Sequence, residues 1–160
     1  MQMCRYRAHR LAGGCDVTTF SAQVGKWVSQ SQARMDAVRK KSVERVVEII
    51  LTPQGKGGRL RVDTGFMRSS FMASTSSMPQ LFREKPPGDN FDFDEASFTL
   101  VLAGWRAEDK LYAGFTANYA GHREFGSRGQ PADLMVTMAA QRWQQIVAEV
   151  ARELRSRAGG

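Results

Sequence analysis

The sequence predicts an α+β fold, with a long N-terminal helix, a three- to four-stranded antiparallel sheet, a short helix and a long C-terminal helix. Apolar residues recur at steps of three and four near both ends of the chain, which is typical of amphipathic helices. The middle of the chain holds short apolar stretches bounded by Gly, Pro and Asp clusters, which is typical of strands and turns. The chain has 160 residues, of which 42% are hydrophobic, enough for one domain with a buried core.

The first helix is predicted over about 19–51, after Thr18 and Thr19, which are good N-cap residues. Pro53 ends it, because proline cannot continue the hydrogen-bond ladder. Residues 1–17 show no periodicity and are predicted to form a flexible leader, so deleting 1–16 should leave folding and assembly intact. The domain is expected over 18–157, with a frayed tail at 158–160. The apolar face of the helix comprises Phe20, Val24, Trp27, Val28, Met35, Val38, Val46, Val47 and Ile50.

Three strands are predicted, over 66–75, 97–103 and 110–116, with residues 105–109 as a hairpin connection. Between the first two strands, the segment at about 76–95 contains three prolines and is predicted to be a loop insertion. Its apolar side chains are unusual for a loop that meets only water, so we expect them to become ordered against a partner. The alternative is that its phenylalanines pack on the subunit's own sheet. The candidate interface residues are Leu81, Phe82, Phe91 and Phe93.

After the third strand, Asn118 is predicted to cap a short helix that runs through Phe125, with Gly126 at its C′ position. Pro131 suits the first position of the second long helix. The apolar side of that helix comprises Met135, Val136, Ala139, Trp143, Ile146, Val147, Val150 and Leu154.

The formal net charge is +7, from 23 Lys and Arg against 16 Asp and Glu. A basic chain is compatible with an acidic partner or nucleic acid. The densest basic stretch, residues 39–41, is too short for a nucleic-acid tail, and a solvated helix face is the simpler interpretation. Residues 81–110 form the acidic region of the chain, with seven acidic and four basic side chains.

The apolar runs are far shorter than the roughly 18 residues that cross a bilayer, so no membrane-spanning segment is expected. The leader lacks the apolar stretch of a signal peptide, so secretion is not expected. Cys4 and Cys15 lack the spacing of a metal site and are expected to be reduced thiols in a cytosolic setting.

Three patterns could carry chemistry, and each has a better structural interpretation. Asp63-Thr64-Gly65 matches the aspartic protease triplet, but its flanks are charged, so we expect a capped turn that leads into a strand. The glycines of 55–58 follow a helix and precede a strand, the reverse of a phosphate-binding P-loop. His122 lacks a nucleophile motif around it. We therefore expect no catalytic, cofactor-binding or metal-binding residues, and no enzymatic activity.

Two segments carry a more specific pattern. Residues 62–70 read VDTGFMRSS, residues 119–127 read YAGHREFGS, and Gln130 and Pro131 follow. In this order, between an N-terminal and a C-terminal helix, they resemble the gene-ten-like neck and tail-component family of tailed bacteriophages over roughly 18–157. Met67 stands where leucine is usual in that family, and Ser127 where threonine is commoner. The motif residues, expected to be structural, are Asp63, Thr64, Gly65, Arg68, Tyr119, Glu124 and Gly126.

The resemblance implies a structural virion protein of the head-tail junction (a connector, tail terminator or tail completion protein) that is assembled in the host cytoplasm. Such a protein forms a ring, expected to be hexameric, that caps or completes the tail tube and joins it to the head connector. The implied partners are further copies of the chain, a connector or stopper protein, and the tail tube protein. DNA would pass through the lumen without sequence-specific binding, and no membrane is involved.

Two further expectations accompany this interpretation. The alternative function is a small basic DNA-binding or packaging accessory protein, supported by Arg39, Lys40, Lys41 and Arg45. In addition, Arg68 and Glu124 are expected to share one polar network, because the two motif segments supply one cation and one anion.

Overall fold

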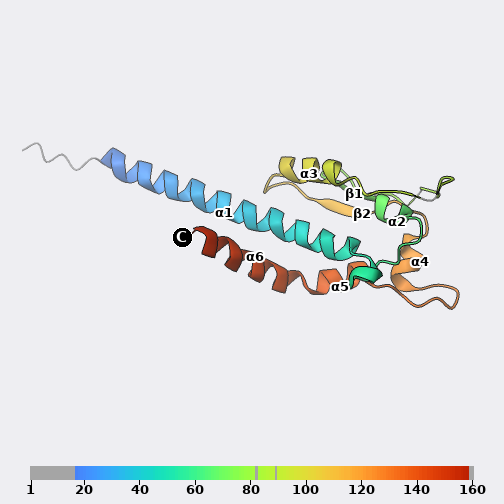
Figure 1. The fold of residues 1–160 in the computed structure, drawn as a ribbon. Coiled ribbons are helices and arrows are strands. Elements are labelled where there is room, and N and C mark those ends of the chain that lie inside the picture. Colours follow the sequence, from blue (N-terminus) through green and yellow to red (C-terminus); the bar gives the residue numbers. More distant parts are fainter. Residues whose placement is uncertain (1–16, 82, 89, 159–160) are drawn as a thin grey trace, which may run out of the picture. The chain divides into compact units, whose positions relative to one another are not determined.

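The computed structural model describes residues 17–81, 83–88 and 90–158, so residues 1–16 of the predicted leader 1–17 and residues 159–160 lie outside the described residues. The first helix begins at Val17, two residues earlier than predicted. The fold is α+β, as predicted (Figure 1). The chain divides into two units, residues 1–33 and residues 34–160, and α1 belongs to both. The elements in order are α1 (Val17–Leu51), the 3-10 turn η1 (Gln54–Lys56), α2 (Phe66–Ser69), β1 (Phe71–Ser74), α3 (Glu95–Gly104), β2 (Tyr112–Phe115), α4 (Ala120–Phe125), α5 (Met135–Gln141) and α6 (Trp143–Ala158).

The sheet has two antiparallel strands among the described residues, so the prediction of three to four strands was wrong. β1 and β2 pair with Phe71 opposite Phe115 and Ser74 opposite Tyr112. The predicted strand 110–116 is confirmed as β2, whereas only the second half of 66–75 is extended, because 66–69 form the helical turn α2.

The predicted strand 97–103 is a helix, α3. Asp94 caps its N-terminus by accepting hydrogen bonds from the backbone N–H of Ser97 at 2.9 Å and from its hydroxyl at 2.6 Å. The bonds from Ser97 also hold the pKa of Asp94 below its ordinary value. Phe98 and Leu102, four residues apart, are both buried, as on one face of a helix. The apolar composition of 97–103 therefore reflects a helix lying against β1, and the capping aspartate was the signal that distinguished it from a strand.

The predicted C-terminal helix is present, but it begins four residues later than expected and is interrupted. Pro131 precedes the helical region, and Leu134, in the left-handed conformation at φ +51°, is the N-cap of α5. Arg142, at φ −87° and ψ 0°, separates α5 from α6. The short helix α4 ends at Gly126 as predicted, whereas its N-cap is Tyr119 rather than Asn118 and makes no side-chain cap bond.

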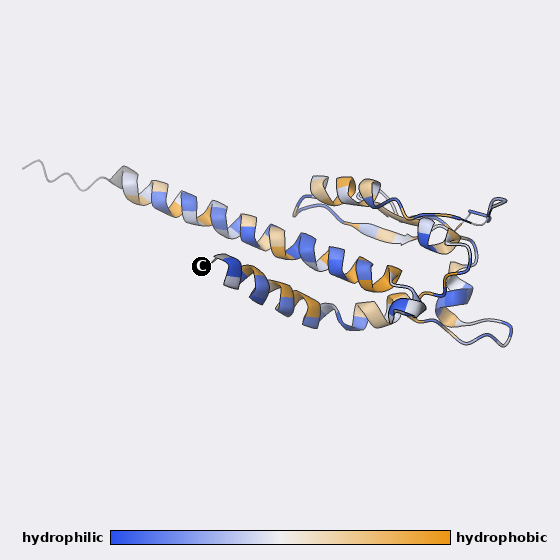
Figure 2. Cartoon of the chain, viewed as in Figure 1, coloured by the Kyte–Doolittle hydropathy of each residue, from blue (hydrophilic) through white to orange (hydrophobic). Residues whose placement is uncertain are grey.

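The core of residues 34–160 is formed by side chains from the C-terminal part of α1, the two strands and the shorter helices. Figure 2 shows the apolar residues at the C-terminal end of α1, where Val47, Ile50 and Leu51 are buried. In the described part of the chain, no helix is both long and apolar enough to cross a bilayer. The buried cluster comprises Val47, Ile50, Leu51, Leu60, Phe66, Met67, Phe71, Phe98, Leu102, Trp105, Phe115, Ala117, Ala120, Met135 and Ala139.

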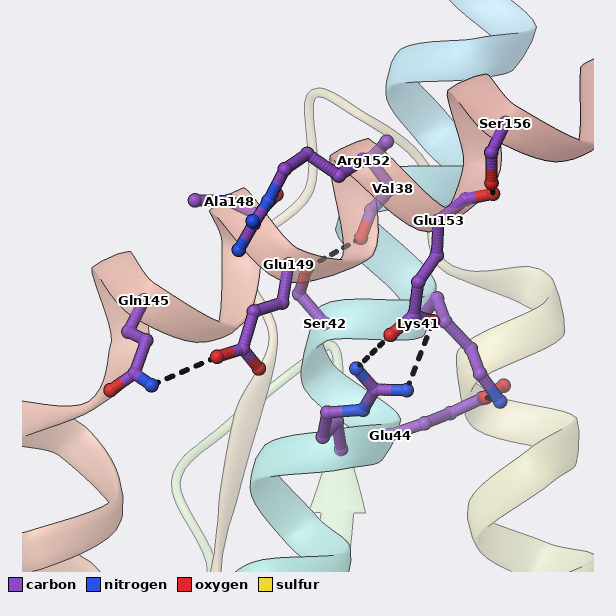
Figure 3. A network of polar contacts seen from close by, with 11 residues as sticks. Val38, Lys41, Ser42, Glu44, Gln145, Ala148, Glu149, Arg152, Glu153 and Ser156 are labelled. Atoms are coloured by element: carbon purple, nitrogen blue, oxygen red, sulfur yellow. Dashed lines mark hydrogen bonds and ion pairs between the residues drawn. The ribbon is translucent and has the colours of Figure 1, made fainter. Parts of the chain in front are cut away.

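A bidentate ion pair joins α1 to α6. The guanidinium of Arg45 donates to the two carboxylate oxygens of Glu153 at 2.8 and 3.1 Å, and Figure 3 shows the two helices side by side at this point. Next to it, Ser42 is fully buried and donates to the carbonyl of Val38 at 2.7 Å. On α6, Ile146 and Val150 are buried as the amphipathic pattern predicted.

The Arg45–Glu153 pair predicts a pH dependence of stability. The hydrogen bonds from Arg45 lower the pKa of Glu153 in the folded protein. Because the pKa is lower in the folded protein, the ion pair stabilises the fold above the ordinary pKa of glutamate. This stabilisation is lost as the pH falls through the pKa that Glu153 has in the folded protein. We expect Glu153→Gln to lower the urea midpoint at about pH 7 and to lower it less as the pH falls. The effect should be modest, because both groups are partly exposed. Glu108→Gln is the control, since it removes an exposed carboxylate away from this ion pair. An equal pH dependence in both variants would contradict the prediction.

Candidate functional site

The fold brings the two motif segments together around one small cavity. The cavity has a volume of about 310 Å³, and five of the seven motif residues line it, whereas Glu124 and Gly126 do not. The segments meet because the backbone N–H and hydroxyl of Thr116 donate to the carbonyl of Ser70 at 2.9 and 3.0 Å, extending the pairing of β1 and β2. We call this the motif cavity, and its lining comprises Arg61, Val62, Asp63, Thr64, Gly65, Phe66, Met67, Arg68, Lys85, Tyr119 and Arg123.

Gly65 opens the turn that leads into α2. Its φ of +83° lies in the left-handed region, which side chains other than glycine rarely adopt. A Cβ at this position would stand 2.3 Å from the carbonyl oxygen of Phe91, because the backbone N–H of Phe91 donates to the carbonyl of Thr64 at 3.1 Å. The glycine of the motif therefore allows the backbone of Phe91 to approach closely. The prediction that Asp63 or Thr64 caps this turn was wrong, because neither side chain makes a cap bond to α2.

Gly65→Ala is expected to lower the free energy of unfolding by about 1 to 3 kcal/mol, because the residue is held in a conformation that disfavours alanine. Denaturant unfolding followed by circular dichroism measures it. Gly121→Ala is the matched control, since no atom lies within 4 Å of its Cβ position and it stands inside α4. A loss of stability for Gly121→Ala as large as that for Gly65→Ala would refute this role of Gly65.

Basic side chains dominate the lining of the motif cavity, and Arg61 and Arg123 share one acidic partner. The carboxylate of Asp133, which is 1% exposed, lies 2.7 Å from Arg61 Nε and 3.4 Å from Arg123 Nε. Arg61 also donates to the carbonyl of Pro131 at 2.9 Å, and Arg59 to the carbonyl of Asp133 at 3.1 Å. Sequence reasoning missed this cluster, because nothing in the local pattern around Asp133 indicates which arginines the fold brings to it.

Tyr119 and Arg68 complete the motif cavity. Burial raises the pKa of the Tyr119 hydroxyl above its ordinary value, and its ring centre lies 6.2 Å from that of Phe66. The Nε of Arg68 is buried and has no hydrogen-bond partner in the described part of the chain. The cavity thus holds aromatic packing and fixed cations.

Glu124 does not pair with Arg68, so the expected Arg68–Glu124 network was wrong. Its buried carboxylate accepts hydrogen bonds from the backbone N–H groups of Val136 and Thr137 at 3.0 and 2.8 Å, and from the Thr137 hydroxyl at 2.7 Å. These amides belong to the first turn of α5, which has no partner for them within the helix. Gly126, at φ +81°, turns the chain after α4, where a Cβ would lie 2.9 Å from the carbonyl oxygen of Gln130.

The candidate interface residues of the loop insertion separate into two groups. Leu81 is 57% exposed, and Phe82 lies outside the described residues. Phe91 and Phe93 instead pack on the subunit's own core, where their ring centres lie 5.4 Å from Phe66 and 6.1 Å from Phe71. For these two phenylalanines, the structure favours the alternative that they pack back on the subunit.

The basic cluster on α1 is engaged in contacts within the chain. Arg39 donates to the carbonyl of Arg106 at 2.7 Å and lies over the ring of Trp105 at 3.8 Å. Lys40 donates to the carbonyl of Ala103 at 2.8 Å, and Lys41 to the carboxylate of Glu44 at 2.7 Å. Arg39, Lys40 and, through Glu153, Arg45 hold α1 against its neighbours, whereas the Lys41–Glu44 pair lies within α1. These contacts weigh against a free phosphate-binding patch.

An open apolar groove of about 1300 Å³ lies in the unit of residues 34–160. Its walls come from the C-terminal part of α1, the two strands, α4 and α5, and its rim includes the exposed side chains of Leu81, Val136 and Trp143. We call it the groove, and its apolar lining includes Val43, Val46, Val47, Ile50, Phe71, Met78, Leu81, Trp105, Leu111, Phe115, Phe125, Met135, Val136 and Trp143.

Comparisons with protein-family models, with curated proteins and with solved structures find no match for this chain. Among the described residues, no group of three or more His, Cys, Asp or Glu side chains is arranged to hold a metal ion. The function therefore has to be argued from the two motif segments and from the surfaces of the molecule.

Proposed function

We propose that the chain is a structural, non-enzymatic subunit of the phage head-tail junction, found in the virion neck or tail. In this proposal, copies of the chain form a ring, expected to be hexameric, that caps or completes the tail tube and joins it to the head connector. Its partners are other copies of itself, a connector or stopper protein and the tail tube protein, while DNA passes through the lumen without sequence-specific contacts.

The observation that carries the proposal is the groove. Open grooves with mainly apolar walls are a common binding surface for segments of partner proteins. The groove's volume of about 1300 Å³ also exceeds the roughly 300 to 1,000 Å³ of small-molecule pockets. An assembly subunit works through such surfaces, whereas an enzyme needs polar groups that converge on a reacting atom.

The roles of the motif residues support the same conclusion. Gly65 and Gly126 allow turns that a side chain would obstruct, and Glu124 caps α5. These three residues stabilise the connections between elements, which is a structural role. The contacts of Arg39, Lys40, Lys41 and Arg45 within the chain weigh against the alternative of a DNA-binding or packaging accessory protein.

The mass of the purified chain in solution tests the proposal. Light scattering at low and high salt should give a closed oligomer whose mass does not fall with salt, since apolar contacts are not screened. Electron microscopy of the same sample should show rings with a central channel, and co-expression with the products of neighbouring genes should recover a connector or tail tube protein. A chain that stays monomeric in every condition, or that binds duplex DNA with a steep salt dependence, would contradict it.

A further inference from the structure

The motif cavity carries an excess of positive charge. Its lining includes the cationic side chains of Arg61, Arg68, Lys85 and Arg123, against the single carboxylate of Asp63. Asp63 is exposed, and its carboxylate forms no ion pair with any residue that the structure describes. The cavity therefore attracts anions, because it gathers one sign of charge within walls of low polarity.

Two of the cations in the lining share one counter-charge. The carboxylate of Asp133 lies 2.7 Å from Arg61 Nε and 3.4 Å from Arg123 Nε. The other hydrogen bonds of these two guanidiniums go to neutral acceptors, the carbonyl of Pro131 at 2.9 Å and the amide oxygen of Gln130 at 3.3 Å. Each guanidinium keeps N–H donors that these contacts do not use, so the group can accept a second anion.

Arg68 has no partner within the described part of the chain. Its Nε is buried without a hydrogen bond, and its side chain forms no ion pair there. It also lines a neighbouring hollow together with Glu48 and Glu95, but pairs with neither carboxylate. A half-buried cation without an acceptor is unfavourable, so a ligand that supplies an acceptor is stabilised at this position.

The size and stiffness of the motif cavity suit a small ligand. Its volume of about 310 Å³ lies at the lower end of the roughly 300 to 1,000 Å³ of small-molecule pockets. Its wall is rigid, because the ring of Phe66 is fully buried and packs against those of Tyr119 and Phe91. Among small anions, phosphate fits several guanidiniums best, because its oxygens accept hydrogen bonds from more than one of them at once.

We propose that the motif cavity binds a phosphate group, either free or at the end of a small molecule. Arg68 is the principal ligand, and Arg61 and Arg123 supply further donors from the opposite motif segment and its approach. Asp63 opposes binding through repulsion between like charges. The inference goes beyond the proposed function and does not depend on it, because the cavity lies within a single chain.

The test uses the full chain and three variants. Arg68→Gln removes the unpartnered cation, and Asp63→Asn removes the repelling charge at an exposed position. Arg155→Gln is the matched control, because it removes an exposed arginine of α6 that does not line the cavity. Isothermal titration calorimetry and thermal shift measure the binding of inorganic phosphate, glycerol phosphate and acetate at constant ionic strength in sodium chloride. Circular dichroism checks the folding of each variant.

We expect both phosphates to bind the wild type and Arg155→Gln with equal affinity, and to bind Arg68→Gln about tenfold more weakly or less, since a charged hydrogen bond is lost. Asp63→Asn should bind them more tightly than the wild type. A gain of affinity cannot come from a damaged fold, so this variant keeps the test decisive even if Arg68→Gln does not fold. Acetate should bind more weakly than phosphate. The tighter of the two phosphates identifies the source as free phosphate or a phosphate ester.

Other outcomes would overturn the inference. Phosphate that binds no better than chloride would exclude the site, and equal affinity in the wild type and Arg68→Gln would assign binding to another surface. Acetate that binds as tightly as phosphate would replace the phosphate with a carboxylate. A monomeric chain that binds phosphate would contradict the proposed function alone, whereas a ring that binds none would contradict this inference alone.

Discussion

Replacing Phe66 by alanine is expected to lower the free energy of unfolding by about 3 to 5 kcal/mol, the range for a large aromatic side chain lost from a packed core. Phe66 is fully buried, and its ring meets that of Phe91 edge-on at 5.4 Å. The ring of Tyr119 lies on it at 6.2 Å, and the guanidinium of Arg83 at 5.3 Å. Phe66 thus joins the first motif segment, the loop insertion and the second motif segment, so its loss affects all three.

Denaturant unfolding followed by circular dichroism measures the effect of Phe66→Ala. Phe66→Leu keeps most of the volume and should cost less than about 1.5 kcal/mol. Phe125→Ala is the control for an exposed ring, since Phe125 is 74% exposed, and should stay within about 0.5 kcal/mol of the wild type. If Phe66→Ala were no more destabilising than Phe125→Ala, the motif cavity would not be a centre of packing.

Glu124→Ala is expected to destabilise the protein by about 1 to 3 kcal/mol, because it removes the acceptor of three partly buried donors at the start of α5. Three donors lose their acceptor in this variant, namely the two backbone N–H groups at Val136 and Thr137 and the Thr137 hydroxyl. The start of α5 should fray, so hydrogen exchange at these two amides should accelerate more than exchange in the core of α1.

Two further variants test whether the effect of Glu124 is local. Glu124→Gln keeps one acceptor oxygen and should fall between wild type and Glu124→Ala, whereas Glu108→Ala removes an exposed carboxylate and should have little effect. Because Glu124 is bonded to α5 and not to Arg68, the costs of Glu124→Ala and Arg68→Ala should add to within about 0.5 kcal/mol in the double mutant. A clear coupling energy between them would show that the carboxylate has partners other than those at α5.

The sequence predicted the N-terminal helix and the turn at Gly126 for reasons that are local, whereas it did not predict the interruption of the C-terminal helix at Arg142. An apolar residue at every third or fourth position predicts an amphipathic helix, but the pattern does not say which part of the apolar face is buried: Val47 and Ile50 are, whereas Trp27 is exposed. Gly126 follows a short helix, where a positive φ is needed and glycine adopts it without strain. The prediction of a strand over 97–103 was wrong, because a short apolar run fits a strand or a helix equally well. The hydrogen bonds of Asp94 as N-cap favour the helix.

Only the tertiary structure decided which distant groups meet. Asp133 forms ion pairs with Arg61 and Arg123, and Glu124 accepts hydrogen bonds from the amides of α5. Phe91, from the loop insertion, packs on Phe66. These pairings depend on how the chain crosses itself over tens of residues, and single-residue types and local spacing carry no information about that. The sequence by itself determined which residues could form each kind of contact. The fold selected the partners, because a buried polar or aromatic side chain can contact only the groups that the packed chain places next to it.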